Sequence, residues 1–292
     1  MKGLILFLIT CTALYVSCRS PQQETAVFPP YEEMIGTADS VYTAGDLADA
    51  IRAYRKVHRA YPDSAYVHRV LSRAYLGLGM LKEAKDMLDA TSYSQDTLGR
   101  LSKFRHYANW SIFAGDTTLL RTYTDSILFY AFHTYPSPYR NAAFNEVFLK
   151  DYDRAMAHLD RFVAYGEPEQ KPINMAFLYL EEGDSASAHP ILEEAGKGLT
   201  LILLKDPVDT DALFELAEVH AIKKDTAVAM DYLERAVQTG LGKQWWIYHL
   251  ISDTSVPDPV FGALKDNTRF LRLKDSLMEE RRKMREELMN GE

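Results

Sequence analysis

The sequence predicts an all-α fold made of paired helices stacked along the chain. Apolar residues recur at i, i+3, i+4 and i+7 in segments of about twelve to sixteen residues, the spacing of one buried face of an α-helix. No segment keeps the strict alternation of polar and apolar residues that is typical of a half-buried β-strand. The 292 residues suffice to bury a sizeable core in one elongated domain or two compact ones, without disulfides or metals.

The helical part contains an internal repeat. The stretches 45–65, 79–96, 150–169 and 224–240 can be laid over one another. Each has a short polar turn, an alanine five residues on and a large apolar residue four positions later. Repetition of this kind is typical of solenoids, in which each unit buries its apolar face against its neighbours.

The repeat resembles the tetratricopeptide repeat (TPR), a helix pair with characteristic small and aromatic positions. The resemblance implies an α-solenoid of about six TPR-like helix-turn-helix repeats over residues 31–243, forming a right-handed superhelix with a C-terminal helical cap. The first helices would line its concave face and the second helices its convex face. In chain order, the matching residues are Ala38, Ala50, Tyr54, Pro62, Leu71, Ser72, Tyr75, Ala84, Leu88, Tyr107, Ala108, Gly115, Asp116, Ala142, Ala143, Ala155, Leu159, Phe162, Ala176, Tyr179, Gly183, Ala188, Leu192, Ala195, Leu213, Leu216, Ala217, Ala229, Leu233 and Ala236.

Residues 1–17 predict a signal peptide, because Lys2 precedes an apolar run too short for a comfortable transmembrane helix. The run ends at Val16-Ser17-Cys18, which resembles the lipobox of bacterial lipoproteins, where the signal is cut and the cysteine is lipidated. This resemblance implies a lipid anchor on Cys18, a tether over residues 18–30 and a periplasm-facing position in the bacterial cell envelope. An ordinary secretory signal with an incidental cysteine is the alternative.

Composition excludes several classes of function. The 33 Lys and Arg against 41 Asp and Glu leave a net charge of −8, so the chain has no overall attraction to nucleic acid. Its two cysteines are Cys11 and Cys18, and the rest of the chain therefore has no thiol for a disulfide, a redox pair or a cysteine nucleophile.

The sequence has no motif for a metal, a cofactor or catalysis. The eight histidines form no HxxxH or HExxH pair, and the spacing of Asp253, Asp258 and Asp266 does not match a calcium-binding EF-hand. Phosphate-binding glycine loops and the GxSxG nucleophile turn are also missing. We therefore expect no cofactor, no metal and no enzymatic activity, although a catalytic triad of distant residues leaves no signature in the sequence.

The concave face is the predicted binding surface. At one register position of the second, third and fourth copies the chain has Arg69, Arg105 and Arg140, and the geometry of the TPR family places that position in the groove. Arginine can hold a carboxylate with two hydrogen bonds, which favours an acidic partner or a free C-terminal carboxylate. The alternative is a solvated face whose arginine stems cover apolar neighbours. The other predicted groove residues are Tyr66, Arg73, Asn109, Asn141 and Phe144.

Residues 244–292 are predicted to form the cap and a solvated terminal helix, because charges of both signs alternate at i,i+3 and i,i+4 spacing near the C-terminus. The aromatic residues Trp245, Trp246 and Tyr248 are either packed between the last repeat and the cap or exposed as anchors of an interface. The expected core of the cap consists of Trp246, Val260, Phe261, Leu264, Phe270 and Leu271.

Together these features predict a membrane-anchored, non-catalytic scaffold that binds a protein or peptide partner in its concave groove. A structural accessory subunit of an outer-membrane assembly or transport complex, using the convex face or the cap, is an alternative of the same class. A hydrolase or a glycan-binding protein with a hidden site is the contrasting alternative, and clustered carboxylates in a cleft would favour it.

Overall fold

The computed structural model describes residues 28–131, 137–165 and 173–291. The predicted signal peptide, the lipidation site Cys18 and most of the predicted tether lie outside these described residues. Every regular element within the described ranges is a helix, and none of these helices is long and apolar enough to cross a membrane. The helices of the repeats are α1 (Tyr31–Ala44), α2 (Leu47–Ala60), α3 (Ala65–Gly77), α4 (Leu81–Ala90), α5 (Thr97–Ala114), α6 (Thr117–Tyr130), α7 (Ser137–Phe148), α8 (Tyr152–Tyr165), α9 (Ile173–Glu181), α10 (Ser185–Lys205), α11 (Thr210–Ile222) and α12 (Thr226–Thr239).

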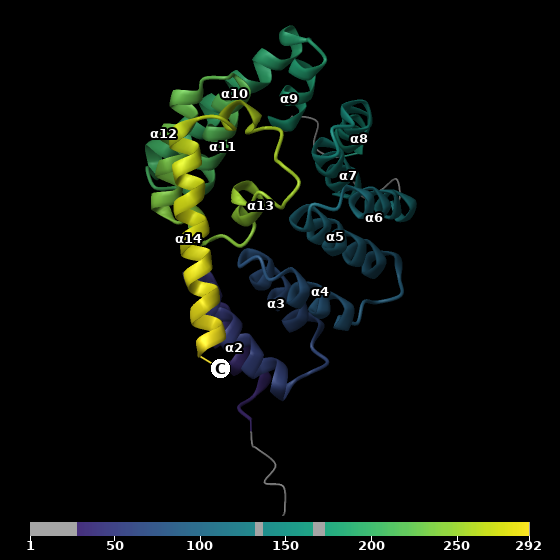
Figure 1. Cartoon of the computed structure of the whole chain (residues 1–292). Helices are drawn as coiled ribbons and strands as arrows, with labels where there is room; N and C mark the ends of the chain where they lie inside the picture. The colour runs from purple at the N-terminus through teal and green to yellow at the C-terminus, as the bar shows by residue number, and fades with distance from the viewer. Residues whose placement is uncertain (1–27, 132–136, 166–172, 292) are drawn as a thin grey trace, which may run out of the picture.

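The twelve helices form six consecutive pairs in a curved stack, which confirms the predicted α-solenoid (Figure 1). Each helix packs against the next one along the chain. The predicted small positions lie at the helix crossings: Ala50, Ala155 and Ala229 have no exposed surface. A larger side chain there would separate the two helices of its pair, which explains why alanine recurs at this register.

Five of the six turns inside the pairs share one local structure. A residue in the left-handed region follows the first helix and an aspartate precedes the second, as at Gly115-Asp116 and Gly183-Asp184, whereas the second pair has Gly79-Met80. The Asp116 side chain accepts a hydrogen bond from the backbone N–H of Leu119, which satisfies a free donor of the first helical turn. Lys150 takes the glycine's place in the fourth pair, with φ 57°.

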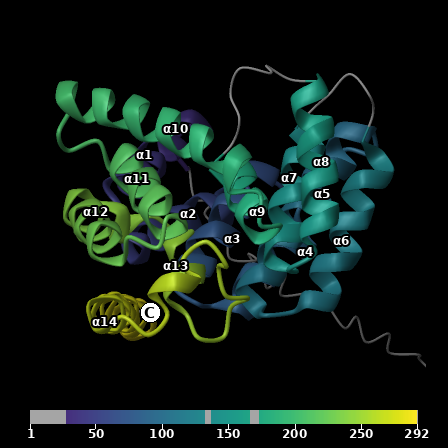
Figure 2. The same cartoon turned by 90° about the horizontal axis from the view of Figure 1, so that it is seen from above.

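The C-terminal region covers the inside of the stack. It contains η1 (Leu241–Lys243), α13 (Ile247–Ile251), η2 (Gly262–Leu264) and α14 (Thr268–Asn290). The short helix α13 packs against α3 and α5, and η2 packs against α11 (Figure 2). The Val256 N–H donates a 2.9 Å hydrogen bond to the Ile112 carbonyl, which fixes this segment to the end of α5.

The aromatic residues of the cap are packed inside the molecule. The Phe113 ring stacks on Trp245 and Tyr248, with centroid distances of 5.6 and 6.1 Å. Trp246 lies edge-on to Phe214 of α11, at 5.0 Å. Of the two expected roles for these aromatics, packing between the repeats and the cap is therefore the one observed.

Helix α14 differs from the solvated helix that its charges suggest. It packs against α2 and α12, so it joins the first repeat to the last (Figure 1). Leu277, Arg281 and Leu288 are buried along one narrow stripe, whereas the remaining faces carry the charges. Leu271, which was expected in the cap core, is 44% exposed because it lies about 100° around the helix from the buried Phe270. Val260, Phe261, Leu264 and Phe270 are buried as predicted.

Candidate functional site

The cap contacts the C-terminal ends of three first helices, α3, α5 and α7. At the C-terminal ends, Gly77 of α3 lies against Trp245, so closely that a Cβ on Gly77 would be 2.9 Å from the Trp245 Cα. Phe148 of α7 lies against the His249 ring, at 5.5 Å. The C-terminal ends of these three helices are therefore occupied by the protein's own chain. The rest of the three helices carries a set of half-buried or exposed side chains that we call the open strip: Tyr66, Arg69, Arg105, Arg140 and Phe144.

Three of the predicted groove arginines form a cluster on α3 and α5. Arg69, Arg73 and Arg105, here called the arginine cluster, are close enough to interact electrostatically. Burial lowers the pKa of the Arg73 guanidinium, and repulsion from Arg105 and Arg69 lowers it further, while the Tyr42 hydroxyl acts in the opposite direction. Within the described residues, none of the three is ion-paired to a carboxylate.

Arg73 is the most enclosed member of the cluster. Its guanidinium lies over the Trp245 ring, 5.9 Å from the centroid, and its Nη2 is 3.4 Å from His106 Nε2. His106 Nδ1 lies 2.6 Å from the Ser102 carbonyl, which can only accept, so Nδ1 carries the proton and Nε2 accepts from Arg73. Burial lowers the pKa of His106 to about 3, and the nearby Arg73 contributes to the shift. This histidine therefore adds no further positive charge at neutral pH.

Tyr66 is held in place by Asp39 of α1. Its hydroxyl donates to Asp39 Oδ1 at 2.9 Å, and the same oxygen accepts a hydrogen bond from the buried Tyr54 hydroxyl. The Tyr66 ring nevertheless keeps 39% of its surface exposed at the edge of the open strip. It provides an apolar contact area next to the arginine cluster.

The fourth repeat contributes a different part of the strip. Arg140 is exposed on α7 and acts on the Glu215 carboxylate of α11, whose pKa is raised by burial and by Asp211 and Asp209. The three arginines of the predicted row are therefore not together. Arg69 and Arg105 belong to the arginine cluster, whereas Arg140 lies near acidic residues and lowers the pKa of Glu215. Phe144 is 39% exposed, with its ring 4.9 Å from that of Phe148. Of the remaining predicted groove residues, Asn109 and Asn141 are half-buried on α5 and α7.

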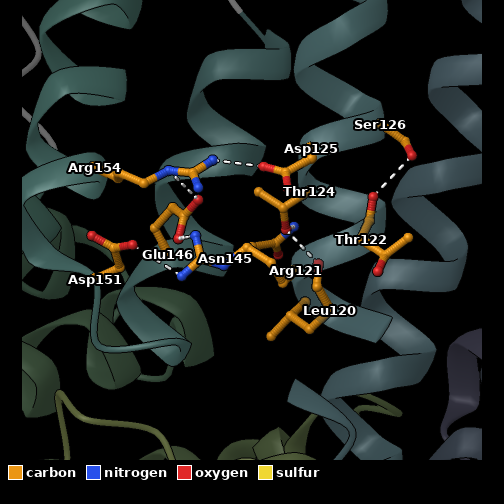
Figure 3. Close-up of polar contacts among 10 residues, drawn as sticks. All are labelled: Leu120, Arg121, Thr122, Thr124, Asp125, Ser126, Asn145, Glu146, Asp151 and Arg154. Carbon is orange, nitrogen blue, oxygen red and sulfur yellow. Dashed lines mark hydrogen bonds and ion pairs between the residues drawn. The ribbon is translucent and has the colours of Figure 1, made fainter. Parts of the chain in front are cut away.

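A second charged region was not predicted. Glu146 of α7 is completely buried and lies between Arg121 of α6 and Arg154 of α8, with N–O distances of 2.5 and 3.1 Å (Figure 3). The two arginines also pair with Asp151 and Asp125, at 3.0 and 2.7 Å. Burial raises the pKa of Glu146, and the two arginines oppose that shift. Each charged group of this network has at least one ion-pair partner of opposite sign within the fold, so the network joins three helices.

The buried position of Glu146 could have been predicted from its place in the repeat. It is the eleventh residue of the fourth copy, and the corresponding residue of the second copy is Tyr75. A carboxylate at a position otherwise used for packing predicts a buried partner of opposite charge.

The structure also holds a group of carboxylates, Glu215, Glu218 and Asp258, between α11 and the cap. Burial raises the pKa of Glu218 well above its ordinary value, and Asp258 and Glu215 add to the effect. Asp258 Oδ2 lies 3.7 Å from His249 Nε2. Neither of two surface grooves beside α10 and α11 is lined by Glu215 or Glu218. Within the described ranges, no three His, Cys, Asp or Glu side chains are arranged to hold a metal ion.

Comparisons with known proteins agree with the helix pairs. Two sequence profiles of the tetratricopeptide repeat match the chain, one over residues 42–98 and the other over residues 173–242. No curated protein matches the sequence.

Among solved structures, MamA is similar at 17% identity with a TM-score of 0.24, covering 69% of this chain and 93% of its own. YrrB, described as a TPR protein with an unusual peptide-binding site, is similar at 17% identity with a TM-score of 0.25, covering 75% of this chain and 91% of its own. Repeats of this type are typical of scaffolds that bind proteins or peptides. The two profile matches show that residues 42–98 and 173–242, which form helix pairs with buried small residues, are similar to the tetratricopeptide repeat.

Proposed function

We propose that this protein is a membrane-anchored, non-catalytic scaffold that binds an extended or helical segment of a protein partner along the open strip. The observation that carries the proposal is the arginine cluster, which has no carboxylate partner within the described residues and lies beside the exposed Tyr66 ring. The cap occupies the C-terminal ends of α3, α5 and α7, so a partner would lie along the rest of these helices, where the open strip is.

The chemistry of the strip favours an acidic segment. An anion between Arg69, Arg73 and Arg105 would relieve the repulsion that lowers the pKa of Arg73. Planar guanidinium groups hold carboxylates with paired hydrogen bonds, so a glutamate or aspartate side chain or a free C-terminal carboxylate would fit. Aromatic side chains such as Tyr66 and Phe144 would add contact area that costs little conformational entropy on binding.

The predicted lipid on Cys18 would confine this binding to a membrane surface of the bacterial envelope. With a short tether, the search for a membrane-bound partner becomes two-dimensional and the effective concentration of the strip rises. An accessory subunit of an outer-membrane assembly or transport complex would use the same anchor with a different face. The carboxylate group beside the cap gives the hydrolase alternative less support, because it lines neither of the grooves described above.

The test is a crosslinked pull-down from native membranes with the full chain and with a double variant, Arg69→Glu and Arg105→Glu. We expect the partner to be lost from the variant while its circular dichroism spectrum stays helical. Lys56→Glu with Arg272→Glu makes the same change in net charge at exposed sites of α2 and α14, so it should retain the partner. If both variants bind the same proteins as the parent chain, the open strip is not the binding surface.

A further inference from the structure

Helix α10 is longer than its place in the stack requires. It has 21 residues, whereas its partner α9 has 9, and it forms an outer edge of the molecule (Figure 2). Beyond the end of the pair, Leu201, Leu204 and Val208 expose 60, 74 and 63% of their surface. Apolar side chains gathered at one place on a surface mark a contact with another molecule more often than scattered ones do.

A groove of about 630 Å³ adjoins these side chains. Its floor is apolar and includes Leu192, Leu216 and Val219, while Gly196 and Thr200 of α10 form one wall. Leu201 belongs both to that wall and to the exposed apolar end. The groove and the projecting leucines are thus continuous parts of one surface.

The fold has room for a side chain at both glycines of α10. Gly196 and Gly198 lie in the middle of a helix, where glycine is less favourable than alanine. A Cβ at Gly196 would meet only Val219, at 4.0 Å, and a Cβ at Gly198 would meet nothing within 4 Å. Neither position has positive φ. Gly196 lines the groove, where the missing side chain lowers the helix surface and allows another backbone to come close, whereas Gly198 lies on the opposite face of the helix.

We propose that this surface binds a second copy of the chain, with the two α10 helices packed antiparallel about a two-fold axis. Each copy would place Leu201 and Leu204 against the Gly196–Thr200 wall of the other. A two-fold contact requires a patch that complements itself, and α10 carries both the projecting side chains and the lowered wall.

The charges of α10 support the antiparallel direction. Glu193 is paired with Lys197 within the helix, at 3.8 Å, and Asp206 accepts a hydrogen bond from the Val208 N–H. This leaves Glu194 exposed before the glycines and Lys205 exposed at the end of the helix. An antiparallel pair places Glu194 of one helix beside Lys205 of the other, whereas a parallel pair would place like charges together. This proposal does not rest on the proposed function of the open strip.

One test uses a thiol at the axis. Because Cys11 and Cys18 are the only cysteines, Thr200→Cys gives the rest of the full-length chain a single thiol. Oxidation of the full-length variant should produce a disulfide-linked homodimer, since the small side chains let the Cα atoms approach within disulfide range. Leu271→Cys on α14, 44% exposed before substitution, should stay monomeric. A product with another protein, or no dimer from Thr200→Cys, would overturn the proposal.

A second test fills the groove without endangering the fold. Gly196→Leu has free space and raises helix propensity, so its thermal stability should equal or exceed that of the parent chain. We expect recovery of a differently tagged, co-expressed copy to fall about tenfold or more, which corresponds to at least about 1.4 kcal/mol. Gly196→Ala is the matched control and should retain most of the recovery. If Gly196→Leu and Leu204→Glu both co-purify their second copy normally, α10 is not the interface.

Discussion

Two charged regions of this solenoid differ in whether the fold itself supplies their counter-charges. Around Glu146, a buried carboxylate meets two arginines, and both arginines reach further carboxylates. Around Arg73, three arginines gather with a neutral histidine and no paired carboxylate among the described residues. A buried or half-buried charge that is paired within the fold contributes to the structure. An unpaired charge of this kind is available to bind a group of opposite charge on another molecule.

The largest loss of stability is expected from removing the buried carboxylate of the network around Glu146. Glu146→Ala should lower the free energy of unfolding by about 3 kcal/mol, because it leaves Arg121 and Arg154 without their shared buried partner. We place the effect at the lower end of the usual range because both arginines are about a third exposed and keep their other carboxylates. Urea unfolding measures it. Glu287→Ala on the exposed face of α14 is the control, and an equal effect there would remove the distinction between the two regions.

A smaller loss of stability is expected at Arg281, a buried cation that is held by backbone carbonyls. Arg281 is 2% exposed, and its Nη2 donates to the carbonyls of Gly242 and Gln244, at 2.5 and 2.9 Å. Burial lowers its pKa to about 10, so it is still charged at neutral pH. Arg281→Met should cost about 2 kcal/mol, since charge-assisted hydrogen bonds are lost while the stem is replaced. Hydrogen exchange should show faster exchange in α14, and unchanged protection there would contradict this role.

The neutral histidine of the arginine cluster predicts a pH dependence. The folded-state pKa of His106, about 3, lies below its ordinary value of 6.5, so the unfolded chain binds the proton first. Its contribution to stability is present above pH 6.5 and is lost as the pH falls toward 3. Between pH 7 and pH 5 it should amount to about 1 to 2 kcal/mol. His106→Gln should reduce the slope by this amount in urea titrations at the two pH values, and an identical slope would show that His106 titrates normally.

The smallest effect is expected at the uncompensated arginines. Arg69→Ala and Arg105→Ala should each change the free energy of unfolding by less than about 0.5 kcal/mol, because each removes a like charge and breaks no ion pair within the described residues. Thermal unfolding at low salt gives the most sensitive measurement, since added salt screens the repulsion. A loss of 2 kcal/mol or more from either variant would make the arginine cluster a structural feature, like the network around Glu146.

The repeat alone was sufficient to predict the helix pairs and much of the core. Ala50, Ala155 and Ala229 occupy crossings that the chain's own periodicity marks, and Val260 and Phe261 are buried in the cap as expected. The course of α14 could not be predicted in the same way. Its buried stripe is narrow among many charges. Which side chains of α14 face the core depends on its contacts with α12 and with α2 near the other end of the chain.

The open strip illustrates the same limit. Local register placed Arg69 and Arg105 on the first helices. Only the packed chain joins Arg73 to His106, brings Arg140 near enough to Glu215 to affect its pKa, and sets the cap against α3, α5 and α7. Periodicity and turn chemistry act over a few residues, so the sequence by itself determined the helices, their pairing and their small crossing residues. The closing of the stack by α14 and the division of charges into compensated and uncompensated regions depend on contacts between distant segments, and these were decided by the tertiary structure alone.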